Sequence, residues 1–277
     1  MPPPKRNDRR KPTEPKKRAA RPASKPKTGK TGKPGQVVQN QPMRLNKYVA
    51  HAGVCSRRQA VEYIKDGLVT VNEQKILEPG YEIQANDVVR FKGNIIQPEE
   101  RKVYILMNKP KGVITTMNDE KGRKTVFDLI KGKIPERVYP VGRLDRETVG
   151  LLLLTNDGDL AKRLSHPSHK APKVYYVTLE KNLKPSDLDK IMRGIELEDG
   201  LAEVDKAFYL YKDKKDEVAI EIHIGRNRIV RRIFQSLGYE VKKLDRVYYA
   251  GLTKKDLPRG FWRHLTDQEV IMLKHFV

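Results

Sequence analysis

The chain has 277 residues, of which 57 are Lys or Arg and 35 are Asp or Glu, so its formal net charge at pH 7 is +22. This length accommodates a catalytic core and one small additional domain, and the charge indicates a polyanionic partner. The single cysteine, Cys55, excludes an intramolecular disulfide and a zinc site built from several cysteines. No apolar run approaches the length of a membrane span, and residues 1–30 contain no apolar signal-peptide core. We therefore expect a cytoplasmic protein with no membrane partner.

Residues 1–42 form a basic segment rich in proline. They contain nine prolines and 13 Lys or Arg against two acids, with almost no large apolar side chains. Such a segment cannot bury enough surface to offset the entropy of ordering it, so a disordered tail is predicted. Two roles stay open for it: a mobile arm that raises affinity for a nucleic acid without choosing a sequence, or an extension that only keeps the chain in solution.

Residues 43–91 predict two short helices followed by short strands. Apolar residues recur at helical spacing from Leu45, and Gly53 ends that helix. Ser56 caps a second helix, which Gly67 closes. The expected strands lie at 68–71, around 76 and at 87–91.

The outward positions of these two helices carry the basic residues Arg44, Lys47, Arg57 and Arg58. Such a face suits backbone phosphates, although a charged helix face by itself indicates only solvent exposure. The segment RLNKYVAHAGVCSRRQAVEYIKDGLVTVNEQ resembles the αL RNA-binding module named after small-subunit ribosomal protein four. The resemblance implies that these helices and the following strand bind structured RNA.

Residues 140–158, PVGRLDRETVGLLLLTNDG, are the centre of the chain's chemistry. An apolar run of strand length, Val149 to Thr155, follows a loop in which Arg143 and Arg146 flank Asp145. Nearby positive charge favours the ionised carboxylate, so Asp145 is a candidate nucleophile or base that needs no metal or cofactor. A solvated loop acid in an ordinary surface ion pair would show the same local pattern.

The longer segment VGRLDRETVGLLLLTNDGDLAKRLSHP resembles the catalytic motif of pseudouridine synthases, and within them the RsuA/RluB/RluE/RluF branch, whose members modify ribosomal RNA. The resemblance makes Asp145, the aspartate of GRLD, the essential residue. KVYYVTLE matches the family's Lys-x-Tyr motif, which places Tyr175 in the active site, where it can stack on an extruded uracil. GRNRIVRR matches the third motif, in which an arginine lies against the catalytic aspartate; alignment selects Arg231 for that ion pair, with Arg226 as the alternate. Many relatives have Gln at the position of Ile229.

Other residues of these motifs are expected to contact the RNA substrate. They are Asn108, Lys109, Lys111, Arg143, Arg146, Lys173, Arg226 and Arg228. NKPKG, at residues 108–112, resembles the first synthase motif, and its two lysines in a stiff turn suit a phosphate contact, although an exposed hairpin tip has the same pattern. Strand alternation puts Tyr176 on the sheet face opposite Tyr175, so Tyr176 is predicted to be a core residue.

The predicted fold class is α+β. After a linker at 92–102, we expect a pseudouridine synthase domain over 103–277 with a mostly antiparallel sheet flanked by helices. His166 and His169 are the closest approach to a metal-ligand cluster, and we expect neither a metal nor a cofactor. Isomerisation of uridine to pseudouridine fits this expectation because it requires no energy source or redox partner.

The expected substrate is a specific uridine in ribosomal RNA, free or within an immature ribosomal subunit, bound by a monomer. GRNRIVRR and GYEVKKLDR resemble the large-subunit enzymes more than the small-subunit one. Two alternatives remain: a non-catalytic RNA-binding or ribosome-assembly factor, and a synthase acting on transfer RNA.

Overall fold

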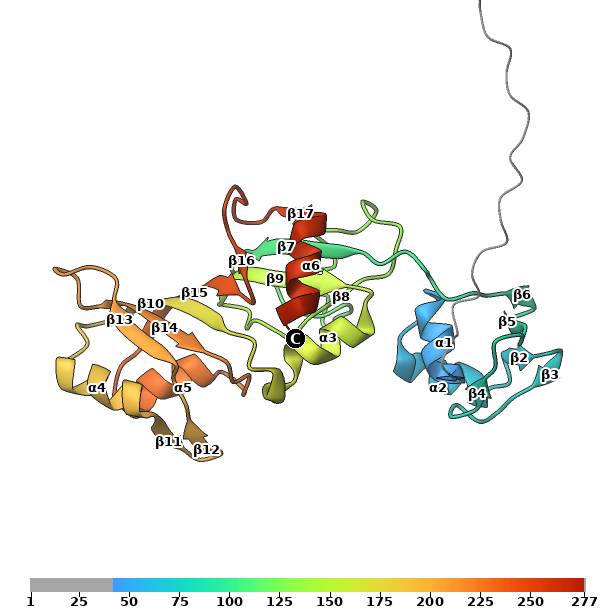
Figure 1. The fold of residues 1–277 in the computed structure, drawn as a ribbon, viewed down its shortest axis with the longest axis horizontal. Helices are drawn as coiled ribbons and strands as arrows, with labels where there is room; N and C mark the ends of the chain where they lie inside the picture. The colour runs from blue at the N-terminus through green and yellow to red at the C-terminus, as the bar shows by residue number, and fades with distance from the viewer. Residues whose placement is uncertain (1–41, 277) are drawn as a thin grey trace, which may run out of the picture. The chain divides into compact units, whose positions relative to one another are not determined.

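The structure, a computed structural model, describes residues 42–276 and has the predicted α+β class, with helices and mostly antiparallel sheets (Figure 1). The predicted disordered tail, residues 1–42, lies outside the described part except for Pro42. No helix in the described part is both long and apolar enough to cross a membrane.

The N-terminal described segment forms a small core of its own. Helices α1 (Leu45–His51) and α2 (Arg57–Lys65) follow the predicted positions, and the Ser56 hydroxyl caps α2 by accepting a hydrogen bond from the Gln59 amide at 3.2 Å. Cys55 is buried in this core. The short strands are β1 (Met43–Arg44), β2 (Val69–Val71), β3 (Gln74–Lys75), β4 (Glu82–Ile83), β5 (Val89–Phe91) and β6 (Asn94–Ile95).

One large sheet organises the chain from residue 103 onward. Its strand order is β13-β14-β10-β15-β9-β7-β17, with β16 beside β15 and β8 beside β9, and only β15 and β9 pair in parallel. Its strands are β7 (Tyr104–Lys109), β8 (Tyr139–Pro140), β9 (Val149–Thr155), β10 (Lys173–Leu179), β13 (Lys206–Tyr209), β14 (Glu217–Ile222), β15 (Val241–Tyr249), β16 (Leu252–Thr253) and β17 (Trp262–His264). A separate hairpin pairs β11 (Ile195–Leu197) with β12 (Gly200–Ala202).

Helices cover different faces of the two halves of this sheet (Figure 1). At one half, Ile191 of α4 and Phe234 of α5 pack against β10, β14 and β15; at the other, Leu160 of α3 and Leu273 of α6 pack against β7 and β9. The helices are α3 (Gly158–Ser165), the 3-10 helix η1 (Pro167–His169), α4 (Pro185–Arg193), α5 (Ile229–Ser236) and α6 (Asp267–Phe276).

Strand β9 is buried over its whole length, as the apolar run predicts. Leu152 and Leu154 belong to the core that includes α4 and α5, whereas Leu151 and Leu153 belong to the core under α3 and α6. A strand covered on both faces needs apolar residues at every position, which explains a continuous run in place of an alternating one.

The prediction that Tyr176 is a core residue is wrong. Its side chain is 45 % exposed, whereas Tyr175 is 8 % exposed. Alternation did place the two rings on opposite faces of β10, but α4 and α5 cover only the face of Tyr175. A sequence pattern cannot show which face of a strand receives a cover.

Gly150 allows the two halves of the sheet to meet. Its φ is +106°, and it pairs with Arg246 where β9 runs parallel to β15. A Cβ atom at Gly150 would overlap the Arg246 carbonyl oxygen and lie 2.6 Å from the Arg246 nitrogen. Glycine is therefore required at this position both for its conformation and for space.

We expect Gly150→Ala to lower the free energy of unfolding by about 3 kcal/mol or more, because backbone strain adds to a steric clash. Urea unfolding followed by circular dichroism measures this. Gly122→Ala is the control: Gly122 also has a positive φ, of 64°, but no atom lies within 4 Å of its added Cβ. Equal losses in the two variants would contradict the close-packing argument.

Candidate active site

The loop before β9 is held from below by Lys109. This lysine is fully buried, and its ammonium group donates hydrogen bonds to the carbonyl oxygens of Asp145 at 3.1 Å, Arg146 at 3.3 Å and Thr148 at 2.8 Å, as well as to Pro110 at 3.1 Å. Burial lowers the pKa of Lys109 to about 8, and the carboxylates of Asp145 and Glu147 oppose that shift. At neutral pH the ammonium therefore stays charged and connects three residues of the loop.

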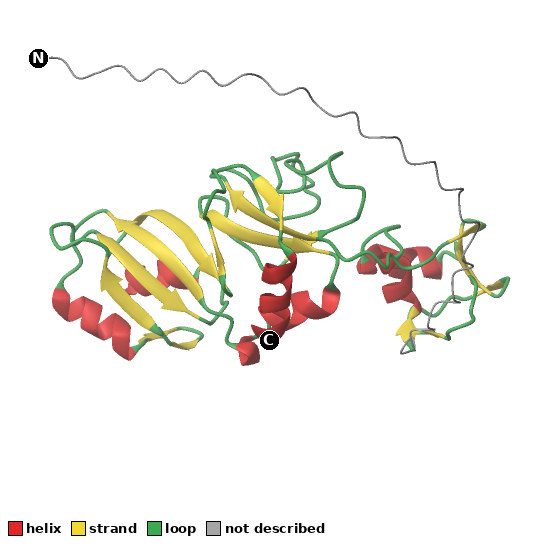
Figure 2. Ribbon diagram, turned by 45° about the horizontal axis from the view of Figure 1, so that its top comes forward, coloured by secondary structure: helices red, strands yellow, loops and turns green. Residues whose placement is uncertain are grey.

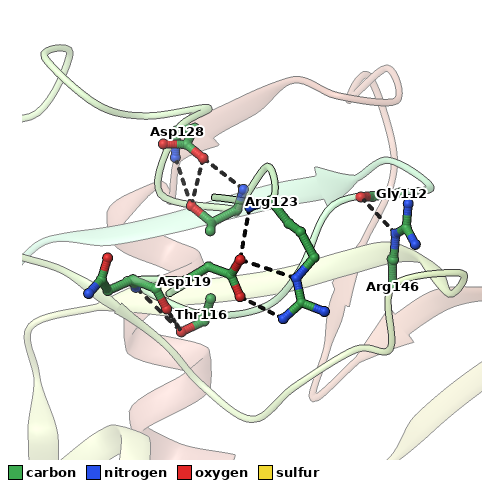
Figure 3. A network of polar contacts seen from close by, with 8 residues as sticks. Gly112, Thr116, Asp119, Arg123, Asp128 and Arg146 are labelled. Carbon is green, nitrogen blue, oxygen red and sulfur yellow. Dashed lines mark hydrogen bonds and ion pairs between the residues drawn. The ribbon is translucent and has the colours of Figure 1, made fainter. Parts of the chain in front are cut away.

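The segment that follows β7 holds the same loop from the other side. The Thr115 hydroxyl donates to the Leu144 carbonyl at 2.7 Å and accepts from the Leu144 amide at 3.2 Å. The Gly112 amide donates to the Arg146 carbonyl at 2.9 Å, and the Arg146 side chain reaches back to the Gly112 carbonyl (Figure 3). The backbone on both sides of Asp145 is thus fixed before any substrate binds.

An internal clasp orders the turn that extends from this segment. Asp119 accepts hydrogen bonds from the Arg123 guanidinium at 2.7 and 3.1 Å, and from its backbone amide at 2.8 Å (Figure 3). These bonds lower the pKa of Asp119 to about 2, so the carboxylate stays ionised at neutral pH.

The Asp145 side chain lines a small pocket. It is 34 % exposed, and one carboxylate oxygen lies 3.9 Å from the Arg228 guanidinium. The buried ring of Tyr175 lines the same pocket. The other lining residues are Arg143, Leu144, Thr148, Arg226, Ile229, Val230 and Leu244. A carboxylate, an aromatic ring and a guanidinium group therefore surround a space that is partly open to solvent.

Comparison with known proteins agrees with this geometry. Residues 103–236 match the RNA pseudouridylate synthase family, and residues 43–89 match the S4 domain. The chain is 47 % identical over 235 residues to ribosomal large subunit pseudouridine synthase B from Bacillus subtilis strain 168, and the match covers 83 % of this chain and 95 % of the relative. The chain belongs to the RNA pseudouridylate synthase family.

Two further similarities support this membership. The synthase is 35 % identical over 239 residues to the dual-specificity RNA pseudouridine synthase RluF from Escherichia coli strain K12, covering 86 % of this chain and 80 % of RluF. A crystal structure of a pseudouridylate synthase superposes with a TM-score of 0.61 at 28 % identity, over 83 % of this chain and 99 % of that one.

The structure differs from the predicted ion pair between Asp145 and Arg231. The guanidinium within 4 Å of Asp145 belongs to Arg228, whereas Arg231 donates to the Val241 carbonyl at 2.8 Å. Arg228 has a left-handed backbone, with φ 48°, at the residue that precedes α5. Arg231 lies almost one helical turn further on and stays close enough for Asp145 to oppose the lowering of its pKa by burial.

The alternate, Arg226, is committed elsewhere in the synthase. Its guanidinium donates to the carbonyls of Gly200 at 2.7 Å and Leu201 at 2.9 Å, and lies 3.4 Å from Asp199. Asp199 also receives two hydrogen bonds from Arg232. These contacts attach the β11–β12 hairpin to the segment that leads into α5.

Three residues predicted to contact RNA are buried or half-buried, with their polar groups bonded to the protein backbone. Asn108 and Lys109 belong to strand β7 and not to an exposed turn; the Asn108 amide donates to the Leu257 carbonyl at 2.9 Å. Lys173 donates to the carbonyls of Ala171 at 2.8 Å and His223 at 2.7 Å. Burial, followed by the charge of Arg246, lowers the pKa of Lys173 to about 8. The motifs predict RNA contacts for Lys109 and Lys173, and only the fold shows that backbone carbonyl groups surround both ammonium groups.

The remaining predicted RNA contacts are accessible. Around the pocket, Arg143, Arg146 and Arg228 are exposed, and the side chain of Lys111 is 70 % exposed beside Glu147. On α1 and α2 and at their first residues, Arg44, Arg57 and Arg58 are exposed and Lys47 is half-buried.

Thr148 is a pocket residue that the motifs did not single out. It is 2 % exposed, and its hydroxyl has no hydrogen-bond partner within residues 42–276. A buried hydroxyl without a partner is costly, so we expect a group of the bound substrate to supply one. The sequence signal that could have indicated Thr148 as a pocket residue is its position three residues after Asp145.

We expect Thr148→Val to lower kcat/KM roughly tenfold without lowering the melting temperature, because the variant loses a substrate hydrogen bond and no protein one. Steady-state kinetics and thermal unfolding measure the two quantities. A lower melting temperature with unchanged kinetics would show that the hydroxyl stabilises the fold instead.

Proposed function

We propose that this synthase isomerises a specific uridine in ribosomal RNA, of the large subunit, to pseudouridine. The main support for this proposal is the position of the Asp145 carboxylate, which lies in one pocket with Tyr175 and Arg228. Lys109 and Thr115 hold the loop that carries it. The names of its relatives support the ribosomal substrate: the Bacillus subtilis protein is a large-subunit synthase and shares 47 % identity with this chain.

The reaction breaks the bond between uracil N1 and ribose C1′, turns the base, and joins C5 to C1′; the C5 proton leaves and N1 takes up a proton. Asp145 starts this sequence as nucleophile or base, with the Arg228 guanidinium 3.9 Å from its carboxylate. Tyr175 stacks on the extruded base. Arg231 contributes a second positive charge, and the nearby Asp145 carboxylate opposes the lowering of the Arg231 pKa by burial.

In this proposal the RNA is bound by two domains that a linker joins. The domain at 43–91 contacts RNA phosphates through Arg44, Arg57 and Arg58, a linker spans 92–102, and the catalytic domain occupies 103–277. Extruding the uridine costs a few kcal/mol, and these phosphate contacts supply it. We further propose that the synthase works as a monomer in the cytoplasm, where ribosomal subunits are assembled.

The test is release of tritium from RNA labelled at the 5-position of its uridines, because the C5 proton leaves when C5 joins the ribose. Large-subunit RNA should release tritium, and small-subunit RNA and transfer RNA should not. Release from transfer RNA alone would show that transfer RNA, and not ribosomal RNA, is the substrate. Absence of release from every RNA, free or in immature subunits, would favour a non-catalytic binding factor.

The basic tail is a separate element of the proposal. Deleting residues 1–42 removes 13 Lys or Arg and two acids. We expect weaker RNA binding and an unchanged kcat, and a plot of log K against log salt whose slope is shallower by about one for each phosphate that the tail neutralises. Filter binding across a salt series measures the slope, and an unaltered slope would leave the tail only a role in solubility.

A further inference from the structure

The sheet has a face that the catalytic pocket does not use. On β13, β14, β10 and β15, helices α4 and α5 cover the face that carries Tyr175, and no helix of the described residues covers the opposite face (Figure 2). We call this opposite face the outer face. Its central row, from edge to interior, is Phe208, Ala219, Tyr176 and Asp245.

Two aromatic rings dominate the outer face. Phe208 is 51 % exposed and Tyr176 is 45 % exposed, and each stands directly beside Ala219 in the strand register. Ala219 is fully buried although its side chain is a single methyl group. The two ring-bearing positions are two strand spacings apart, about 10 Å, with the buried Ala219 between them, so the rings form an exposed aromatic strip across three strands.

Positive charge lies at the interior end of this row. The Asp245 carboxylate forms ion pairs with Lys254 at 2.6 Å and Arg259 at 3.1 Å. Because two cations pair with one acid, a net charge of +1 remains at this place. The Arg259 side chain is 56 % exposed. The side chain of Lys243, one row away, has no hydrogen bond or ion pair with another residue of 42–276.

The other acids of the outer face are neutralised. Glu221 pairs with Lys206 at 3.3 Å, and Glu217 lies 3.9 Å from Lys214. No unpaired carboxylate among the described residues of this face therefore opposes a polyanion. Exposed aromatic rings on a sheet, next to an excess of positive charge, are the combination that binds unpaired nucleotides, because bases stack on the rings and phosphates meet the cations.

We propose that the outer face binds unpaired nucleotides of the RNA substrate, with bases stacked on Tyr176 and Phe208 and a phosphate at Lys254 and Arg259. The proposal rests on the proposed function in so far as the RNA is the one that carries the target uridine. Consecutive residues of a strand point to opposite faces, so this site and the pocket of Tyr175 are separate. The outer face therefore adds affinity and takes no part in the chemistry.

The experiment introduces a fluorescent reporter into the full chain by Phe208→Trp and titrates it with octaadenylate at low salt. This oligonucleotide contains no uridine, so its binding is independent of turnover at Asp145. We expect stacking to quench the new fluorescence, and the additional change Tyr176→Ala to weaken that binding roughly tenfold. The wild-type chain corrects for Trp262.

Ile271→Trp is the matched control, because Ile271 is 49 % exposed on α6, which packs on β7 and β9 at the other half of the sheet. Quenching at position 208 alone supports the proposal. Equal quenching at both positions would indicate general attraction to a basic protein, and no quenching would indicate a partner of another kind; either result overturns the proposal. Unchanged thermal unfolding of each variant verifies that the fold is intact.

With the labelled ribosomal RNA, Tyr176→Ala combined with Phe208→Ala should raise KM by roughly tenfold or more and leave kcat unchanged. A lower kcat would contradict the separation of the two sites. Absence of tritium release by the wild-type chain would refute the proposed function and leave the octaadenylate result standing.

Discussion

Asp145→Asn is expected to lower kcat on the order of a thousandfold or more while RNA affinity stays within about a factor of two to three. The amide has nearly the same shape as the carboxylate but can act neither as a base nor as a nucleophile. The Asp145 backbone contact with Lys109 is unaffected, because Lys109 binds the carbonyl oxygen and not the side chain. Single-turnover tritium release separates the chemical step from binding.

Asp213→Asn is the control for this change. Asp213 is an exposed acid in the turn between β13 and β14, and its substitution makes the same alteration of charge. It should retain full activity. If Asp145→Asn instead weakened RNA binding and left the single-turnover rate unchanged, the carboxylate would serve the bound RNA and another group would carry the chemistry.

Lys109→Met is expected to lower the free energy of unfolding by about 3–5 kcal/mol and to reduce kcat strongly. The substitution removes a buried ammonium that bonds four carbonyl oxygens, and three of these belong to the loop of Asp145. Those carbonyls would lose their donor, and the loop would lose the geometry that aims the carboxylate. Chemical denaturation and single-turnover kinetics measure the two effects.

Lys111→Met distinguishes this role from a phosphate contact. Lys111 lies two residues further along, with a side chain 70 % exposed in a surface ion pair with Glu147, so its loss should cost less than about 1 kcal/mol. We expect this control to lower RNA affinity slightly and to leave kcat unchanged. If Lys109→Met reduced RNA affinity with no change in stability, Lys109 would be a phosphate ligand after all.

The pH dependence of stability provides a second readout for Lys109. Burial lowers its pKa to about 8 in the folded chain, against the ordinary lysine value of 10.5. Between these two pH values the unfolded chain binds more protons, so the contribution of this group to the free energy of unfolding rises with pH. Lys109→Met should lose this share of the rise. Lys173, whose pKa is also lowered to about 8, should keep contributing a share of its own in that variant.

Local patterns in the sequence were sufficient wherever the determining contacts are local. The run from Val149 to Thr155 forms a buried strand. The predicted Ser56 cap of α2 is present, with the Ser56 hydroxyl accepting a hydrogen bond from the Gln59 backbone amide. Helix caps and strand patterns depend on residues within a few positions of one another, so one segment contains all the information.

The motif resemblance also predicted that Asp145 and Tyr175 lie in one site, and in the structure both residues line the same pocket. What it could not supply was the environment of the charged residues around them. The polar motif around Lys109 predicts an RNA contact for this lysine, but its carbonyl partners in the loop lie 36 to 39 residues away in sequence. Asn108 is bonded to a carbonyl 149 residues away.

Tertiary structure alone decided which arginine meets Asp145 and which tyrosine is covered. Arg228 and Arg231 occupy the same motif. In the fold the Arg228 guanidinium, at the residue before α5, lies 3.9 Å from the carboxylate, and Arg231 donates to the Val241 carbonyl. Tyr176 alternates correctly with Tyr175, yet it is exposed because α4 and α5 pack on one face only. Local sequence patterns and motif resemblance were enough to predict the fold class and the family, and the role of Asp145 stays a prediction. Burial and the choice of charge partner depend on segments distant in the chain, and only the packed fold brings those together.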